Sequence, residues 1–213
     1  GVARTILGAA RAARGMPGAD PRAMSHSWLF TGPPGSGRSL AAIDFAAALM
    51  CTDPEEPGCG RCEACRAVLE TKQHTDLVLV DPQEVIIPVD TVREVIGRAA
   101  SLPTVAPWRV VIFNNADRLN NNGANALLKT VEEPPARTVI IMCAPSDAPE
   151  DFSQTLRSRC RHLYIPSPSV ESITAQLVSE GASDHDAHLA ALTSLRHVGR
   201  ARRLVNDTAV QKR

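Results

Sequence analysis

The chain has 213 residues, of which 44% are hydrophobic and 3% aromatic, so it is long enough for one large or two small domains with a mostly aliphatic core. Its 23 lysines and arginines balance 23 aspartates and glutamates, and this excludes the strongly basic overall composition typical of nucleic-acid-binding domains. No apolar run approaches the roughly 20 residues of a membrane span, and the N-terminus lacks the pattern of a signal peptide. We therefore expect a cytoplasmic chain with no membrane partner.

Apolar strands alternate with helices over the first 166 residues. Helical spacing of apolar residues predicts helices over 3–14, 39–50, 91–101 and 120–133, and apolar runs between them predict strands over 27–31, 76–80, 109–113, 138–143 and 162–165. Asp90 is expected to cap the helix over 91–101, and Pro103 to end it. Nearly continuous apolar strands that alternate with helices indicate an α/β fold, in which helices cover both faces of a parallel sheet.

The pattern changes around Pro166-Ser167-Pro168, beyond which only helices are predicted, over 169–181, 184–195 and 199–208. We expect an α/β domain over 1–166, with a cysteine-bearing insert at 51–66, and a small helical lid domain over 167–213. The end of the chain is locally basic, because Asp207 is the one acid in its last eighteen residues, against Arg196, Arg200, Arg202, Arg203, Lys212 and Arg213.

Residues 32–39, between the first predicted strand and the next helix, read Gly-Pro-Pro-Gly-Ser-Gly-Arg-Ser. A phosphate-binding loop has the pattern G-x-x-x-x-G-K-[ST], in which backbone N–H groups surround phosphate oxygens, the lysine reaches the β- and γ-phosphates and the hydroxyl binds Mg²⁺. Arg38 stands at the lysine position, and the scaffold is kept by Gly32, Gly35, Gly37 and Ser39. Because a helix N-terminus attracts anions even without the lysine, binding of a nucleotide or an anion stays open.

The acidic partners of a working phosphate loop are also missing. In such enzymes an aspartate at the end of a neighbouring strand holds Mg²⁺, and a following acid polarises the attacking water. Here the strand over 109–113 is followed by Asn114 and Asn115, and Asp117 comes three residues late, where we expect a capping role. An amide is a poor Mg²⁺ ligand and no base. The loss of the lysine and of both acids predicts that the chain does not hydrolyse ATP.

Four cysteines, Cys51, Cys59, Cys62 and Cys65, have the spacing C-x₇-C-x₂-C-x₂-C. Thiols of a cytoplasmic chain stay reduced, and four of them at this spacing suit a tetrahedral Zn²⁺ site. Such a closed site has no position for a reacting water, so we predict a structural zinc. Free thiols, or His74 as a replacement ligand, are the alternatives; Cys143, in an apolar strand, is expected to be a core residue.

Five segments of the chain occur in the order found in the clamp-loader branch of the AAA+ proteins, and residues 4–207 resemble that branch. They are the phosphate loop, the four-cysteine insert, residues 87–93 (Ile-Pro-Val-Asp-Thr-Val-Arg), residues 125–135 (Asn-Ala-Leu-Leu-Lys-Thr-Val-Glu-Glu-Pro-Pro) and Ser158-Arg159-Cys160. The resemblance implies a P-loop NTPase-like α/β fold followed by a helical lid, and a third, collar-forming domain that this sequence does not contain.

The resemblance also implies a function in DNA replication. Clamp loaders use ATP binding to open a ring-shaped sliding clamp and place it on primed DNA, and their ATP lies between neighbouring subunits. The partners would be other clamp-loader subunits and, through the complex, the clamp and DNA. In the matching motif the arginine reaches into the ATP site of an adjacent motor subunit, so Arg159 would be a trans-acting finger flanked by Ser158 and Cys160. A guanidinium suits this role because it spreads its charge over the γ-phosphate.

The leading hypothesis is therefore a non-hydrolysing subunit that completes the active site of a neighbour. One alternative is an active ATPase of the same family, with Arg38 in place of lysine. Another is a zinc-dependent DNA-binding module that uses the basic C-terminal helix. Motor subunits also carry a second nucleotide sensor in the lid, and either Gly199 or Arg200 occupies the position of its arginine.

Overall fold

A computed structural model describes residues 1–194 and 196–211, with side chains up to residue 206. Leu195, Lys212 and Arg213, and the side chain of Asp207, lie outside the described residues. The chain divides into two compact units, one formed by residues 1–31 and 39–164, the other by residues 32–38 and the chain from 165 onward. The phosphate loop is thus grouped with the helical C-terminal segment, although it joins a strand and a helix of the larger unit.

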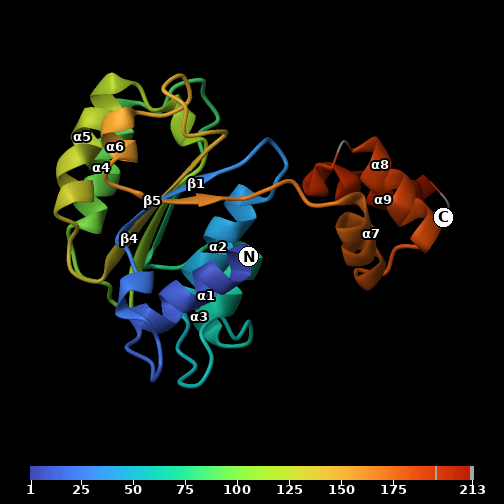
Figure 1. The fold of residues 1–213 in the computed structure, drawn as a ribbon, viewed down its shortest axis with the longest axis horizontal. Helices are drawn as coiled ribbons and strands as arrows, with labels where there is room; N and C mark the ends of the chain where they lie inside the picture. Colours follow the sequence, from blue (N-terminus) through green and yellow to red (C-terminus); the bar gives the residue numbers. More distant parts are fainter. Residues whose placement is uncertain (195, 212–213) are drawn as a thin grey trace. The chain divides into compact units, whose positions relative to one another are not determined.

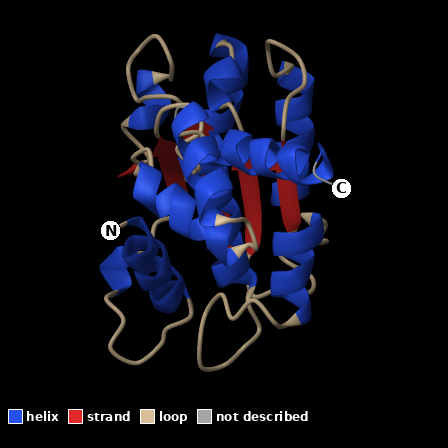
Figure 2. Cartoon of the chain, turned by 90° about the vertical axis from the view of Figure 1, so that its right-hand side faces the viewer, coloured by secondary structure: helices blue, strands red, loops and turns tan. Residues whose placement is uncertain are grey.

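The larger unit is built on a five-stranded parallel sheet in the order β2-β3-β4-β1-β5 (Figures 1 and 2). The strands are β1 (Ser27–Thr31), β2 (Leu77–Val80), β3 (Arg109–Phe113), β4 (Thr138–Ala144) and β5 (Arg161–Tyr164). Each lies within two residues of its predicted range. In β1, β3 and β4 every residue is buried, which is why these strands read as continuous apolar runs.

Helices cover both faces of this sheet, as Figure 1 shows. The helices of the larger unit are α1 (Val2–Ala13), α2 (Arg38–Met50), α3 (Glu63–Arg66), α4 (Val89–Ala99), α5 (Asn121–Glu132) and α6 (Gln154–Arg157). Short turns of other helix types are η1 (Pro21–Ala23), η2 (Ala67–Thr71) and η3 (Ala116–Arg118). Side chains alternate along β1: Leu29 belongs to the core under α4 and α5, whereas the Trp28 ring packs on Phe45 of α2, with 5.2 Å between ring centroids. The predicted α/β fold is confirmed.

The start of α4 differs from the prediction. Its N-cap is Pro88 and Asp90 lies inside the first turn, where its carboxylate pairs with Arg93 at 3.0 Å. The helix begins early because the Ile87 N–H donates to the Arg118 carbonyl at 2.9 Å, which holds the chain extended up to Pro88. The prediction that Asp90 caps this helix was wrong.

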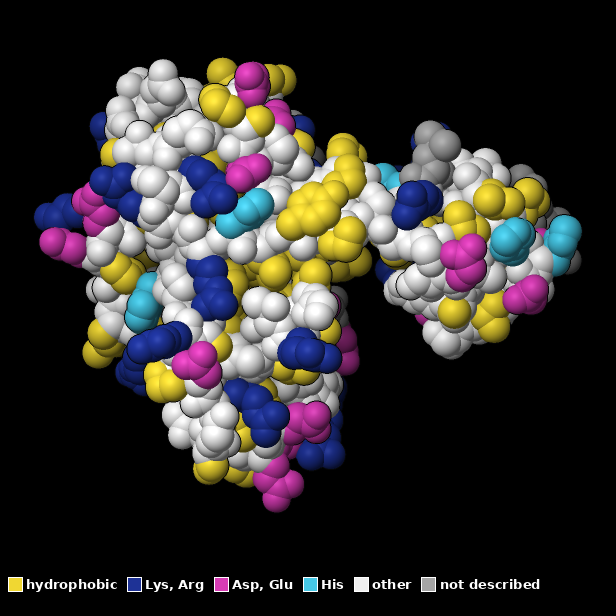
Figure 3. All heavy atoms as spheres, in the orientation of Figure 1, with side chains coloured by type: hydrophobic (Ala, Val, Ile, Leu, Met, Phe, Trp, Pro, Cys, Tyr) yellow, Lys and Arg dark blue, Asp and Glu magenta, His cyan; other side chains and the backbone are white. Residues whose placement is uncertain are grey.

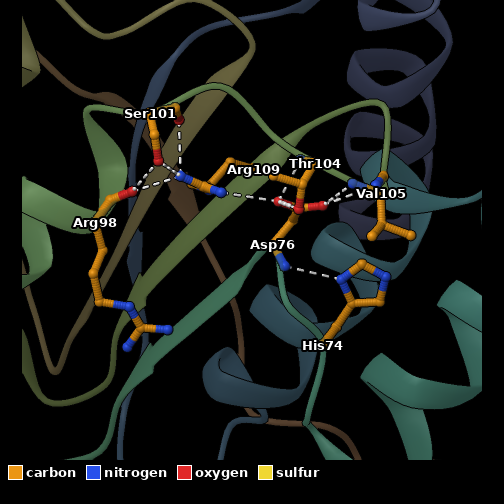
Figure 4. Close-up of polar contacts among 8 residues, drawn as sticks. His74, Asp76, Arg98, Ser101, Thr104, Val105 and Arg109 are labelled. Carbon is orange, nitrogen blue, oxygen red and sulfur yellow. Dashed lines mark hydrogen bonds and ion pairs between the residues drawn. The ribbon is translucent and has the colours of Figure 1, made fainter.

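A buried ion pair between Asp76 and Arg109 fixes the connection from α4 to β3 (Figure 4). Arg109 Nη2 lies 3.0 Å from Asp76 Oδ1, and the side chains are 7% and 0% exposed. The carboxylate also accepts three backbone N–H groups of the connection at 2.7–2.9 Å, those of Thr104, Val105 and Ala106. Burial by itself raises the pKa of the Asp76 carboxyl, but these hydrogen bonds outweigh it and hold the pKa well below its ordinary value.

The smaller unit contains the helices α7 (Val170–Ser179), α8 (Asp184–Thr193) and α9 (Val198–Gln211). Its core is formed by Ile173, Leu177, Ala187, Ala190, Ala191, Val198 and Ala201. Serine caps start α7 and α8, since Ser169 and Ser183 each accept a backbone N–H at 3.1 Å. None of the helices in the described ranges is both long and apolar enough to cross a membrane.

The basic end of the chain is partly neutralised within the smaller unit. Arg202 forms two hydrogen bonds with the Glu180 carboxylate, at 2.8 and 2.6 Å, and Arg196 donates to the carbonyl of Pro168 at 2.9 Å. Gly199 and Arg200, the two candidates for the sensor position, both lie in the first turn of α9. On the face that Figure 3 shows, basic and acidic side chains are interspersed.

Candidate functional site

The phosphate loop connects β1 to α2, and its glycines are required by its shape. Gly35 and Gly37 have φ angles of 83° and 94°, which disfavour any residue with a Cβ. At Gly35 a Cβ would also overlap the imidazole of His197, and at Gly32 it would overlap the carbonyl oxygen of Ile165. The predicted loop scaffold is therefore present, and it packs against residues of its own compact unit.

The arginine at the lysine position turns back onto the loop. Arg38 Nη1 donates a hydrogen bond to the carbonyl oxygen of Gly32, the first loop residue, at 2.6 Å. Ser36 is buried with a hydroxyl that has no hydrogen-bond partner in the described part of the chain, and Ser39 is half-buried in the first turn of α2. A lysine in a working loop reaches outward to phosphate, whereas at least one guanidinium donor of Arg38 is engaged by the loop itself.

The end of β3 carries the two asparagines predicted to replace acids. The Asn114 N–H donates to the Val80 carbonyl at 2.9 Å, and its side-chain oxygen is buried without a hydrogen-bond partner among the described residues. Asn115 adopts a left-handed conformation (φ 51°) and starts η3, and no side chain caps that turn. The capping role expected of Asp117 was therefore wrong, because Asp117 lies inside η3, after its first residue.

The four cysteines come together at the end of α2 and around α3. Their sulfur atoms all lie within 4.8 Å of one another, and the Cys62 and Cys51 sulfurs are 3.9 Å apart. Four sulfurs at about 2.3 Å from a central Zn²⁺ are about 3.8 Å from one another, so the spacing fits such an ion. The backbone N–H of Cys62 points at the Cys59 sulfur at 3.4 Å, which orients that sulfur toward the cluster.

Two thiols of the cysteine cluster have pKa shifts in opposite directions. Burial raises the pKa of the Cys62 thiol, but hydrogen bonds from Thr52 and Cys65 outweigh it and lower that pKa to about 6. Burial raises the pKa of Cys65, and a metal ion would be needed to hold it as thiolate.

His74 is not a member of the cluster, since its Nδ1 accepts the N–H of Asp76 at 3.0 Å. The described residues thus contain a four-cysteine group that could bind a metal ion, and Cys143 is buried in β4 as expected.

The Ser158-Arg159-Cys160 motif follows α6 and places its three side chains in different surroundings. Cys160 is 8% exposed and belongs to the core under α4 and α5; burial raises its pKa to about 12, so it remains a thiol. Ser158 caps the C-terminus of α6, and its hydroxyl donates to the Thr155 carbonyl at 2.9 Å. Arg159 is at the surface, where its Nε lies 2.5 Å from an oxygen of Glu132. The buried cysteine anchors the motif, and the arginine between these neighbours points outward.

A polar cluster that the sequence analysis did not predict joins Thr31, the last residue of β1, to His162, the second residue of β5. Thr31 Oγ1 and His162 Nε2 are 2.6 Å apart, and Arg157 donates to Asp147 at 3.0 Å. Burial lowers the pKa of His162, although Asp147 opposes this, and the hydrogen bond from Arg157 lowers the pKa of Asp147. Ligands of α/β proteins bind at the carboxyl edge of the sheet, which is where Thr31 ends β1. No local signal could reveal the cluster, because Thr31 and His162 are 131 positions apart.

Solved structures with a similar fold include proteins of DNA branch migration and of DNA polymerase III. The RuvB Holliday junction branch migration motor of Thermotoga maritima matches 96% of this chain and 59% of its own at 17% identity, with a TM-score of 0.57. A DNA polymerase III gamma-subunit-related protein of the same organism matches 72% of this chain and 47% of its own at 21% identity, with a TM-score of 0.50. At these identities the likeness concerns the fold alone, and it agrees with the predicted parallel sheet covered by helices on both faces.

Sequence comparison identifies the family. The family model described as "DNA polymerase III, delta subunit" matches residues 19–169. The DNA polymerase III subunit delta' of Pseudomonas aeruginosa is 35% identical over 165 residues (74% of this chain, 49% of the relative), and that of Escherichia coli K12 is 34% identical over 170 residues (78% and 50%). The gamma/tau subunit of Mycobacterium tuberculosis is 33% identical over 174 residues, 79% of this chain and 30% of the relative. The chain spans about half the length of its delta' relatives. It belongs to the delta' family of bacterial DNA polymerase III subunits.

Proposed function

We propose that this protein is a non-hydrolysing subunit of the bacterial DNA polymerase III clamp loader, which supplies Arg159 to the ATP site of a neighbouring motor subunit. In this role it helps to load the sliding clamp onto primed DNA during replication in the cytoplasm. Its partners are the delta subunit and a motor subunit of the gamma/tau type. The observation that carries the proposal is the position of Arg159, held at the surface by a buried cysteine on one side and a helix end on the other.

The phosphate loop supports the non-hydrolysing part of the proposal. At least one donor of Arg38 is used on the Gly32 carbonyl, and the neutral Asn114 and Asn115 stand where Mg²⁺ and the attacking water need carboxylates. We propose that Gly32, Gly35, Gly37, Arg38 and Ser39 form a retained structural loop, within an α/β domain over 1–166 that precedes a lid over 167–213.

The finger is tested in a complex reconstituted from the full-length protein, its motor and delta subunits, the sliding clamp and primed DNA. Replacing Arg159 with alanine should lower ATP turnover, while Arg202→Ala should not. Arg202 is a suitable control because it too is a partly exposed arginine paired with a carboxylate, at 2.6 Å from Glu180. Equal turnover of the wild type and Arg159→Ala would refute the finger.

The active-ATPase alternative makes an opposite prediction for the isolated protein. If Arg38 replaced the lysine, the protein alone would turn over Mg-ATP and Arg38→Ala would abolish that turnover. We expect no turnover from the isolated protein above a blank, and no change on Arg38→Ala.

We further propose that Cys51, Cys59, Cys62 and Cys65 hold a structural Zn²⁺. All four sulfurs are then ligands, so no position is left for a reacting water. Elemental analysis should find one zinc per chain, and chelation should release it and speed amide exchange over residues 51–66. Exchange over β4, which is remote in sequence and in the centre of the sheet, serves as the internal control. A protein purified without zinc would overturn this assignment.

A further inference from the structure

We infer that Glu132 is a positioning residue that orients the guanidinium of Arg159 toward the neighbouring subunit. The inference rests on the proposed function of Arg159 and adds a second residue to it. Glu132 is the last residue of α5, and Arg159 follows α6, so the contact joins two segments 27 positions apart. Arg159 Nε donates to Glu132 Oε1 at 2.5 Å.

Further contacts hold a second nitrogen of the guanidinium. Arg159 Nη1 donates to the carbonyl of Thr155 at 2.8 Å and to the hydroxyl of Ser158 at 3.1 Å. An arginine has five N–H donors: one on Nε and two on each terminal nitrogen. Glu132 thus accepts from Nε. Thr155 of α6 and Ser158, the C-cap of that helix, accept from Nη1. In the part of the chain that the structure describes, no group accepts a hydrogen bond from Nη2.

This arrangement leaves one terminal nitrogen for a ligand. The Arg159 side chain is 36% exposed and that of Glu132 is 47% exposed, so the pair lies at the surface and is accessible to another subunit. With Nε and Nη1 held, the two N–H groups of Nη2 keep a fixed direction and can reach a phosphate oxygen. A held guanidinium also loses less rotamer freedom on meeting its ligand than a free one does.

The position of Glu132 is unfavourable for the helix that carries it. The C-terminus of a helix has a partial negative charge, so a carboxylate in its last turn is destabilising. Glu132 and Glu133 both stand at this end of α5 and precede Pro134. Only Glu132 contacts Arg159; Glu133 makes no side-chain ion pair or hydrogen bond among the described residues. Glu132 thus destabilises its own helix but holds the exposed Arg159. A role outside the helix explains why a carboxylate stands at this position.

The test measures the Arg159-dependent ATP turnover of the reconstituted complex. For each protein this is the turnover of its complex minus the turnover of the complex that contains Arg159→Ala. We expect Glu132→Ala to lower this quantity about two- to fivefold, the size expected for an exposed ion pair. The loss should be in kcat with little change in KM, because the finger acts on the transition state more than on bound ATP. Glu132→Gln keeps an acceptor for Nε and should restore part of the loss. Glu133→Ala is the matched control and should leave turnover unchanged.

The outcomes separate this inference from the proposed function. If Arg159→Ala has no effect, the finger itself is refuted. If Arg159→Ala lowers turnover and Glu132→Ala matches the wild type, only the positioning role is overturned. A rise in turnover with Glu132→Ala would also overturn it, since the carboxylate would then be holding the arginine back. Adding Glu132→Ala to Arg159→Ala should cause no further loss, because Glu132 acts through Arg159.

A spectroscopic measurement tests the contact independently of ATP. The Nε–H resonance of Arg159 should be resolved in the isolated protein, shift on Glu132→Ala and stay in place on Glu133→Ala. An Nε–H signal of Arg159 that is insensitive to Glu132→Ala would contradict the inference whatever the turnover shows.

Discussion

Two arginines of the α/β unit pair with a carboxylate in opposite ways. Arg109 and Asp76 are 7% and 0% exposed, and the carboxylate accepts backbone N–H groups as well, so the pair ties a loop to the sheet. Arg159 and Glu132 are 36% and 47% exposed, and their contact leaves Nη2 of the arginine without a partner among the described residues. The same chemistry therefore stabilises the fold where water is excluded and, under the proposed function, presents an arginine to a partner where it is not.

The largest expected effect concerns the exposed pair. Loss of an arginine finger reduces turnover by roughly 10³–10⁵ in other phosphoryl-transfer systems, so the ATP site next to Arg159→Ala should lose activity on the order of 10³-fold. The free energy of unfolding of that variant should change by no more than about 1 kcal/mol, because an exposed pair contributes little to stability. ATP turnover of the complex and urea unfolding of the isolated variant measure the two quantities. A variant that loses stability in proportion to activity would erase the contrast between the two pairs.

The buried pair should show the reverse. Asp76→Ala leaves the Arg109 charge buried and three backbone N–H groups without their acceptor. Breaking one partner of such a pair typically costs about 3–5 kcal/mol, measured as the free energy of unfolding in urea. Asp90→Asn is the matched control, since Asp90 is 87% exposed and pairs with Arg93 at 3.0 Å. Equal losses for both variants would show that burial does not distinguish these pairs.

The pH dependence of stability follows from the lowered pKa of Asp76. A carboxyl whose pKa is lower in the folded than in the unfolded protein stabilises the fold above its unfolded pKa, near 3.8 for aspartate, and the contribution is lost as pH falls. The unfolding free energy should therefore decline on acidification below about pH 5, with Asp76 adding at most about 1.4 kcal/mol per pH unit. The slope should be shallower for Asp76→Asn, compared at a temperature where both proteins are folded. Parallel curves would assign the acid sensitivity to other carboxyls.

The smallest expected effect is the salt dependence of the exposed pair. Glu132→Ala should change the unfolding free energy by no more than about 1 kcal/mol at low ionic strength, because loss of the ion pair and relief of the repulsion at the C-terminus of α5 oppose each other. This difference should disappear near 1 M salt, where the screening length is only about 3 Å. The loss in Asp76→Ala should persist at high salt, because buried charges are screened much less. Urea unfolding at two salt concentrations measures both.

Most of the fold could be predicted from local patterns. The strands β1, β3 and β4 are buried along their whole length, so an unbroken apolar run identifies each of them. Asn120 is the N-cap of α5 and accepts the Gly123 N–H at 2.9 Å, close to the predicted helix start. The start of α4 was missed because a hydrogen bond from Ile87 to Arg118, 31 positions away, sets it.

The four cysteines could be recognised as one cluster because they lie within fifteen residues of one another and share knuckle-like spacing. The motif around Arg159 could be recognised only by resemblance, since a single arginine after a short helix carries no signal of its own. The cluster of Thr31, Asp147 and His162 had no signal at all, because its members come from different parts of the chain.

The sequence by itself determined the succession of strands and helices along the chain and the glycine scaffold of the phosphate loop. It also determined the absence of the lysine and of the acids that hydrolysis needs. These features depend on residue type and on neighbours a few positions away. The tertiary structure decided what each charge does: Arg38 returns to Gly32, Arg109 is sealed against Asp76, and Arg159 is held by Glu132 at the surface. The reason is physical, since the effect of a charge depends on burial and on partners that only the folded chain brings within hydrogen-bond distance.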